Sequence, residues 1–203
     1  MDVLPPTVVE IEFFQIRCRA VTALVFADCS YGYGCNKVGV ELDAPMLQYF
    51  KYKGAVDLLH HLSLKPQASS SMIRVDVHIS VDSRRYIPTG DRTIPAEQRF
   101  WRFFQYFHAT KFVKLKLDFC MDTIAVVDKS VLDELLGCKF FDKVELLELE
   151  AQYDPAKERS MVTLANLLHS CPMVRDLRLK LSRGLGSRLH FFKSKECQAD
   201  FDK

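Results

Sequence analysis

Cysteine and histidine side chains are the residues in this chain best suited to metal binding or nucleophilic catalysis. Zinc sites need four closely spaced ligands, and Cys18, Cys29 and Cys35 have no suitable fourth ligand nearby. His169 and Cys171 lie two positions apart in an expected helix, so their side chains point in different directions and do not form a catalytic pair. We therefore expect no metal and no cofactor.

Two further enzyme motifs are incomplete. Gly184-Leu185-Gly186-Ser187 follows an expected strand, but it lacks the third glycine and the lysine of phosphate-binding loops. No G-x-S-x-G nucleophile elbow occurs, and Glu145, Glu148 and Glu150 are interpreted as charges on the face of a strand. The sequence therefore predicts a protein that is not an enzyme.

Composition and charge exclude several classes of partner. The 203 residues are 48% apolar and 27% charged, which is ordinary for one soluble domain. A net charge of +2 argues against nucleic acid, and no stretch approaches the roughly 18 consecutive apolar residues of a membrane span. Seven cysteines without a C-x-x-C pair, after a start that lacks a secretory signal, favour the reduced cytoplasm or nucleus.

A short pattern, apolar-x-x-apolar-x-apolar, recurs six times along the chain. Its copies begin 25 to 40 residues apart, near the roughly 20 to 29 residues of leucine-rich repeats. The later anchors alternate with polar residues, as in a strand with one buried face. The six copies are Val21-Leu24-Phe26, Leu47-Phe50-Tyr52, Met72-Val75-Val77, Phe112-Leu115-Leu117, Val144-Leu147-Leu149 and Val174-Leu177-Leu179.

Helix signals lie between the later copies. Pro95 favours a helix over 95–107 with an apolar stripe of phenylalanines, and a short helix is expected over 130–136. Asp154-Pro155 predicts the start of a third helix, which Pro172 ends. Strands that alternate with helices favour a parallel sheet. The buried stripe expected for the third helix is Met161, Leu164, Ala165 and Leu168.

We therefore expect an α/β fold, an irregular leucine-rich-repeat solenoid with a curved parallel sheet on the concave side and short helices on the convex side. Residues 1–20 are expected to form an N-terminal strand or cap, 21–182 the repeat domain, and 183–203 a frayed tail. The expected core contains Leu24, Phe26, Phe50, Val75, Leu115, Leu117, Leu147, Leu149, Leu177 and Leu179.

One charged residue of each of five expected strands falls in a row when the copies are aligned on their middle anchor. The row is Lys51, Asp76, Lys116, Glu148 and Arg178. Its signs alternate, and neighbouring strands lie about 4.8 Å apart. The row therefore forms either a solvated ladder of ion pairs or a face that contacts a partner protein.

Three stretches resemble a known family. They are residues 40–50 (VELDAPMLQYF), 108–117 (HATKFVKLKL) and 165–177 (ANLLHSCPMVRDL), and they are similar to the leucine-rich-repeat half of plant F-box proteins, particularly the large grass group. The similarity runs from about Val21 to Ser182. It implies repeats that bind a protein substrate, beside a separate F-box that docks the adaptor of an SCF-type ubiquitin ligase.

The first residues depart from that family. An F-box begins with Leu-Pro and continues through a helical module, whereas Leu4-Pro5 is followed by Pro6 and by the strand-like 8–13. We therefore expect the substrate-recognition part of an F-box receptor without its own F-box, which would meet the ligase adaptor only through an F-box upstream. The alternative is a free-standing leucine-rich-repeat interaction protein, or a truncated gene product, with no ubiquitin-ligase role.

Overall fold

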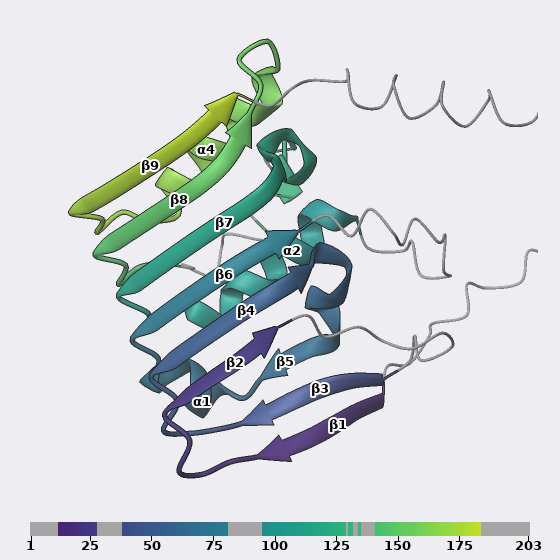
Figure 1. Ribbon diagram of the computed structural model, residues 1–203, viewed down its shortest axis with the longest axis vertical. Helices are drawn as coiled ribbons and strands as arrows, with labels where there is room; N and C mark the ends of the chain where they lie inside the picture. Colours follow the sequence, from purple (N-terminus) through teal and green to yellow (C-terminus); the bar gives the residue numbers. More distant parts are fainter. Residues whose placement is uncertain are drawn as a thin grey trace, which may run out of the picture.

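A six-stranded, all-parallel sheet dominates this α/β protein (Figure 1). The computed structural model describes residues 12–27, 38–80, 95–128, 130–131, 134 and 141–183. Strand order in the sheet follows the sequence, which confirms the predicted parallel sheet. The strands are β2 (Ala23–Ala27), β4 (Tyr49–Ala55), β6 (Arg74–Ser80), β7 (Phe112–Cys120), β8 (Leu146–Tyr153) and β9 (Asp176–Arg183).

A small parallel sheet and a few short helices complete the fold. The small sheet has the order β1-β3-β5, and α2 and α4 lie behind the large sheet in Figure 1. The helix predicted at 95–107 is confirmed, residues 66–71 form the additional short helix α1, and the helix expected at 130–136 falls mostly outside the described residues. These elements are β1 (Glu12–Arg17), β3 (Val38–Asp43), η1 (Val56–His61), β5 (Leu62–Leu64), α1 (Pro66–Ser71), α2 (Ala96–Phe104), η2 (Gln105–Phe107), η3 (Met121–Ile124) and α4 (Glu158–His169).

The strands of the large sheet begin in the same way. The Thr22 carbonyl oxygen accepts two backbone hydrogen bonds, from the N–H groups of Gln48 and Tyr49, at 2.9 and 3.0 Å. The carbonyls of Gln48, Ile73, Lys111 and Glu145 each repeat this double acceptance toward the next strand. Because a slip of one residue would turn each strand's apolar side chains outward, this shared start fixes which residues face the core.

Alternate residues of the central strands point into one core shared by both sheets and the helices. Phe50, Val75, Val113 and Leu147 lie in register on neighbouring strands and are at most 1% exposed. The aromatic stripe of α2 and η2 packs against them, as predicted, and also buries Trp101. Clustered rings contribute more than their buried area alone, so α2 anchors the middle of the sheet.

The expected core is wrong at β9, one edge of the large sheet, and only partly right at β2, the other edge. Leu177 and Leu179 of β9 are 41% and 43% exposed, and Leu24 and Phe26 of β2 are only half-buried. Both strands are edges of the large sheet within the described part of the chain, so each has a neighbouring strand on one side only. The sequence pattern identifies which face a residue lies on, but not how many neighbours cover it.

The prediction for the last helix is wrong in its start and in its buried face. Asp154 accepts hydrogen bonds from Ala156 and Lys157 in a turn, and α4 begins only at Glu158. Met161 and Leu168 are exposed. The buried residues of α4 are Ser160, Thr163, Asn166 and Leu167.

The irregular segment after β7 explains this rotation of α4. The Thr163 hydroxyl donates to the Met121 carbonyl at 2.8 Å, and the Asn166 amide donates to the Val126 carbonyl at 3.1 Å. Buried backbone carbonyls need hydrogen-bond partners, and these carbonyls obtain them from α4. A polar face of the helix is therefore turned inward.

Candidate functional site

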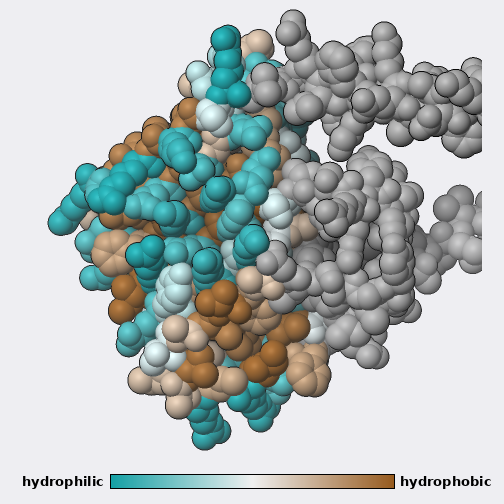
Figure 2. All heavy atoms as spheres, in the orientation of Figure 1, coloured by the Kyte–Doolittle hydropathy of each residue, from teal (hydrophilic) through white to brown (hydrophobic). Residues whose placement is uncertain are grey.

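One face of the large sheet is open. Along β4, β6, β7 and β8, residues that point to the core are buried, while those between them are exposed or half-buried. Helices α2 and α4 lie on the opposite side, and within the described ranges no helix or strand covers the open face. In Figure 2, hydrophilic residues spread over β7 to β9 on this face, and hydrophobic residues gather toward β2. The open face is the candidate site.

The register of the strands corrects the expected row of charges. Lys51, Asp76, Glu148 and Arg178 are in register as predicted, but the β7 member of the row is Lys114 rather than Lys116. Lys116 belongs to the next row. That second row is Lys53, His78, Lys116, Glu150 and Lys180.

A buried threonine caused this error. The β7 copy of the apolar pattern begins at Thr110 and continues to Val113 and Leu115, since Val113 is in register with Val75 and Leu147. Thr110 is completely buried although its side chain is polar. Because this anchor is not apolar, the pattern was aligned two residues late, at Phe112. The predicted member of the charged row was therefore Lys116 instead of Lys114.

Ion pairs join neighbouring members within each row over β7, β8 and β9. The Glu148 carboxylate lies 3.1 Å from the Lys114 ammonium and 2.8 Å from the Arg178 guanidinium. Glu150 lies 3.3 Å from Lys116 and 3.2 Å from Lys180. Their cations hold the pKa values of both glutamates below the usual value, with the Lys114 hydrogen bond the largest cause for Glu148 and the Lys180 hydrogen bond for Glu150.

Charge pairing is different over β4 and β6. Asp76 is held by Arg74 on its own strand at 2.9 Å and accepts a hydrogen bond from the Tyr49 hydroxyl at 2.9 Å. The Arg74 guanidinium lies over the Tyr49 ring, 5.9 Å from its centre. Lys51 makes no ion pair with any described residue. This region therefore presents an unpaired cation beside an aromatic ring and an arginine.

The residues considered for metal binding and nucleophilic chemistry do not converge in the described ranges. No group of three or more His, Cys, Asp or Glu side chains that could hold a metal ion is present there. Cys171 is buried, and burial raises the pKa of its thiol to about 12, so it is a poor nucleophile. Cys29, Cys35 and the glycines of 184–187 lie outside the described residues.

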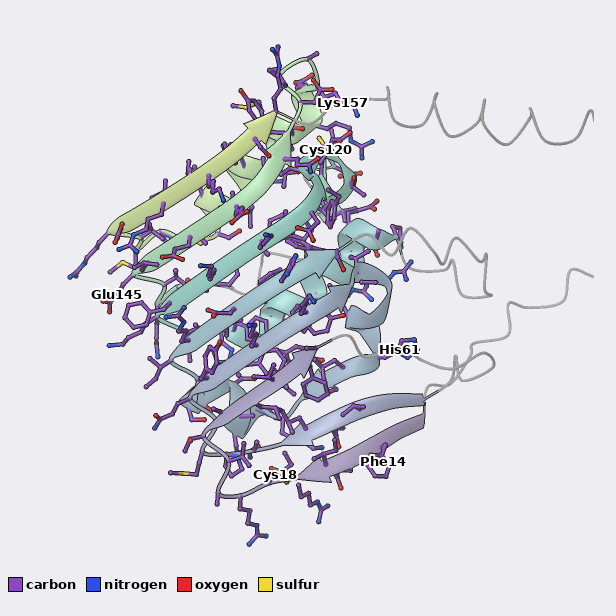
Figure 3. The ribbon with its side chains drawn as sticks, viewed as in Figure 1. Phe14, Cys18, His61, Cys120, Glu145 and Lys157 are labelled. Carbon is purple, nitrogen blue, oxygen red and sulfur yellow. The ribbon has the colours of Figure 1, made fainter. Side chains whose placement is uncertain are left out.

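A cluster at the carboxyl end of the large sheet was missed by sequence reasoning. Figure 3 places Cys120 and Lys157 at that end, where η3 meets the segment before α4. The Lys157 ammonium lies 2.7 Å from the Asp122 carboxylate, and the Cys120 thiol lies 3.6 Å from the Ser160 hydroxyl. The residues of this cluster lie far apart in the sequence. The only sequence signal for the cluster was that the ends of parallel strands tend to meet at one edge of a sheet. The contacts tie η3 to α4.

Comparisons of the chain with models of protein families, with curated proteins and with solved structures found no match. None of the helices in the described ranges is long and apolar enough to cross a bilayer. The site is therefore defined by its own geometry: an open sheet face with paired charges over β7 to β9 and an aromatic, cationic region over β4 and β6.

Proposed function

We propose that this protein is a protein-interaction module, an irregular leucine-rich-repeat solenoid whose open sheet face binds a protein partner. The observation that carries the proposal is the face of a parallel sheet that no described helix or strand covers. Parallel sheets are usually covered on both faces. Repeat proteins are the exception, since they stack equivalent units and use the resulting sheet as a binding surface.

The repeated strand starts support the solenoid part of the proposal. In the large sheet, two backbone N–H groups at the start of each strand from β4 onward donate hydrogen bonds to the carbonyl just before the preceding strand. The strands also follow one another in sequence order across the whole sheet. Units that meet only their sequence neighbours are characteristic of solenoids.

The side chains on the open face support protein as the ligand. Phe112, Tyr49 and Arg74 lie in one register row across β4, β6 and β7, and Phe112 is 38% exposed. Tyrosine and arginine are enriched among the residues that dominate protein interfaces, and aromatic residues generally are enriched there. The charged rows beside this aromatic group would determine the orientation and the choice of the bound partner more than its affinity.

Site-specific photo-crosslinking tests this assignment. A benzophenone amino acid replaces Phe112 on the open face in the full chain, and the matched control carries it at Val127, which is exposed in the segment after η3. We expect a discrete crosslinked protein from the Phe112 position only, in the cells that make this protein. Equal crosslinking at both positions would contradict binding at the open face.

The resemblance to plant F-box proteins supports a narrower role, recognition of substrates for an SCF-type ubiquitin ligase. This role requires an F-box joined to the repeats, and it predicts that the adaptor and the cullin co-purify with the endogenous protein. Immunoblotting with an antibody to residues 154–170, with peptide mapping of the N-terminus, measures which product the cell makes. A product without F-box peptides, purified without adaptor or cullin, would favour the free-standing interaction protein.

A further inference from the structure

The open face carries an excess of positive charge where β6 lies between β4 and β7 (Figure 1). Nine outward residues of these strands, here called the central block, are in register in three trios. Asp76 is the only carboxylate among them, against four lysines and one arginine. The trios are Tyr49 with Arg74 and Phe112, Lys51 with Asp76 and Lys114, and Lys53 with His78 and Lys116.

The negative charge of the central block is recessed and already engaged. Asp76 accepts a hydrogen bond of 2.9 Å from the Arg74 guanidinium and another of 2.9 Å from the Tyr49 hydroxyl, and its side chain is only 17% exposed. The Arg74 side chain is 53% exposed. Asp76 therefore leaves Lys51 without an ion pair among the described residues.

The two lysines of β7 form their ion pairs on the side away from β6. Lys114 lies 3.1 Å from Glu148 and Lys116 lies 3.3 Å from Glu150, and each glutamate also pairs with a cation of β9. The lysine side chains are 48% and 38% exposed, and an ammonium group has three donors, so both can bind a further carboxylate. A ligand above β6 therefore meets cations on both sides.

We propose that the protein partner binds the central block through an extended acidic segment that lies along β6, with an apolar residue and two acidic residues at alternate positions. This inference rests on the proposed function, since it assigns the chemistry of the partner at the same open face. One carboxylate lies between Lys51 and Lys114 and the next between Lys53 and Lys116. The apolar residue packs against Phe112.

The spacing of the lysines selects alternate acidic residues. Neighbouring parallel strands lie about 4.8 Å apart, so the backbones of β4 and β7 are separated by about 10 Å across β6, which leaves room for a carboxylate that lysines from both strands reach. Successive outward residues of one strand are about 6.6 Å apart, and so are alternate side chains of an extended peptide. Two adjacent acidic residues would instead point one carboxylate away from the sheet.

The first trio of the central block supplies the apolar contact. Phe112 is 38% exposed although its ring is large and apolar. It lies in register with Arg74 and Tyr49, one step along the strands from Lys51 and Lys114. An apolar side chain two positions from the first acidic residue therefore falls on Phe112. Burial of apolar surface is the main favourable term in protein association, and the charges select the partner.

The surroundings of the central block favour an acidic peptide over a nucleic acid. A nucleic-acid strand needs a continuous positive groove and free aromatic rings on which bases stack. Glu148 and Glu150 border the block on β8, and Asp118 lies 2.6 Å from His78 at its end. The Tyr49 ring lies under an arginine guanidinium. A short segment with two carboxylates fits between these acidic residues.

Fluorescence anisotropy of labelled synthetic peptides with the purified full chain tests the proposal. The peptide SFSESESFS places phenylalanines and glutamates at alternate positions and reads the same in both directions. The peptide SFSSEESFS has the same composition with adjacent glutamates, and SFSQSQSFS has no charge. We expect the first peptide to bind at least about tenfold more tightly than either control, and added salt to weaken it, because its carboxylates meet exposed cations.

Reversing one charge of the central block locates the binding. Lys51→Glu should weaken binding of SFSESESFS at least about tenfold, because it places like charges together and removes a cation that has no ion pair among the described residues. The matched control, Lys143→Glu, makes the same change of net charge at an exposed position in the turn before β8 and should bind like the wild type. Circular dichroism verifies the fold of each variant, and Lys51→Ala replaces Lys51→Glu if the latter is unfolded.

Three outcomes would overturn the acidic segment. The wild type binds SFSESESFS no more tightly than the control peptides, or not at all. Lys143→Glu weakens binding as much as Lys51→Glu. A labelled single-stranded oligodeoxythymidylate binds more tightly than the peptide and loses affinity in Lys51→Glu, which would assign the block to a polyphosphate.

The photo-crosslink at the Phe112 position separates this inference from the proposed function. A discrete crosslinked protein whose yield falls in Lys51→Glu but not in Lys143→Glu supports both. A crosslink that Lys51→Glu leaves unchanged keeps the open face as the binding surface and overturns the acidic segment. Equal crosslinking at Phe112 and Val127 contradicts the proposed function itself.

Discussion

The two halves of the molecule build the layer beneath the large sheet differently. In the first half the strands β1, β3 and β5 precede β2, β4 and β6, whereas helices α2 and α4 precede β7 and β9. The interval between successive strand starts differs as well. Tyr49 and Arg74 follow the preceding strand start by 26 and 25 residues, and Phe112, Leu146 and Asp176 follow theirs by 38, 34 and 30.

This difference shows that the length of each repeat decides what lies beneath the sheet. An extended strand advances about 3.3 Å per residue and a helix about 1.5 Å, so a return path of fixed length needs more than twice as many residues when it is helical. The short intervals return through a strand of the small sheet, and the one between β4 and β6 adds only the six-residue helices η1 and α1 on either side of β5. The longer intervals accommodate a helix.

Removing the largest side chain from the helix-containing half should have the greatest effect. Trp101 on α2 is completely buried, and its indole N–H donates to the Ile124 carbonyl at 3.0 Å. We expect Trp101→Ala to lower the free energy of unfolding by about 3 to 5 kcal/mol, measured by urea denaturation. Phe14→Ala, at an exposed position, is the control. A similar loss for both variants would show that α2 does not anchor the core.

Matched leucine truncations compare the two halves directly. Leu42 lies in the small sheet and Leu149 in the large sheet of the second half, and each is 1% exposed. Because both belong to one core, Leu42→Ala and Leu149→Ala should each cost about 2 to 5 kcal/mol in a single unfolding transition. Two separate transitions in either variant would instead mean that the halves unfold independently.

A leucine at the edge of the large sheet is the control for the two core leucines. Leu179→Ala removes a side chain that is already partly in contact with water, so its loss of transfer free energy is smaller. The free energy of unfolding, measured by the same urea titration, should fall by less than for Leu149→Ala. An equal fall for both would imply that β9 is covered in solution.

Much of the strand pattern was predictable because it depends on local periodicity. Leu147 and Leu149 alternate with Glu148 and Glu150, and the structure places the first pair in the core and the second on the open face. The aromatic stripe of α2 was equally clear, since its phenylalanines recur at helical spacing. Periodicity within a short segment records which side faces the core.

Features that depend on distant partners were not predictable. Thr110 looks polar in sequence, yet the β7 unit buries it at an anchor position and shifts the charged row from Lys116 to Lys114. The inward face of α4 was chosen by carbonyls of a segment about 40 residues earlier in the chain, at Met121 and Val126. A strand was predicted within residues 1–20, where β1 lies, but the pairing of β1, β3 and β5 into a second layer joins segments far apart in the sequence and was not predicted.

Removing a hydrogen bond that orients α4 should destabilise the protein less than truncating a core side chain. Thr163→Val keeps the shape of the side chain but removes the donor to the Met121 carbonyl. An unsatisfied buried carbonyl costs about 1 to 3 kcal/mol, so we expect a loss in that range by thermal and urea unfolding. Thr123→Val, at an exposed position in η3, is the matched control. Equal stability of both variants would contradict the proposed reason for the rotation of α4.

The smallest expected effects come from carboxylates on the surfaces of the two halves. Glu41 in the first half pairs with Lys65 at 2.8 Å, and Glu148 in the second half pairs with both Lys114 and Arg178. These partners hold the pKa values of both carboxyl groups below the usual 4.5, with the Lys65 and Lys114 hydrogen bonds the largest respective causes. The stabilisation is therefore present above pH 4.5 and is lost as the pH falls through the lowered values.

Glu41→Gln and Glu148→Gln compare these pairs by urea denaturation across pH. Each variant should be slightly less stable than the wild type at neutral pH, and the difference should vanish below the lowered pKa of the carboxylate that it removes. Glu148→Gln should have the larger effect because two cations lose their partner rather than one, and added salt should reduce both effects. A difference in stability that persists in acid would show that these carboxylates act through packing. A larger effect of Glu41→Gln would show that the row over β7 to β9 stabilises the protein no more than one isolated ion pair does.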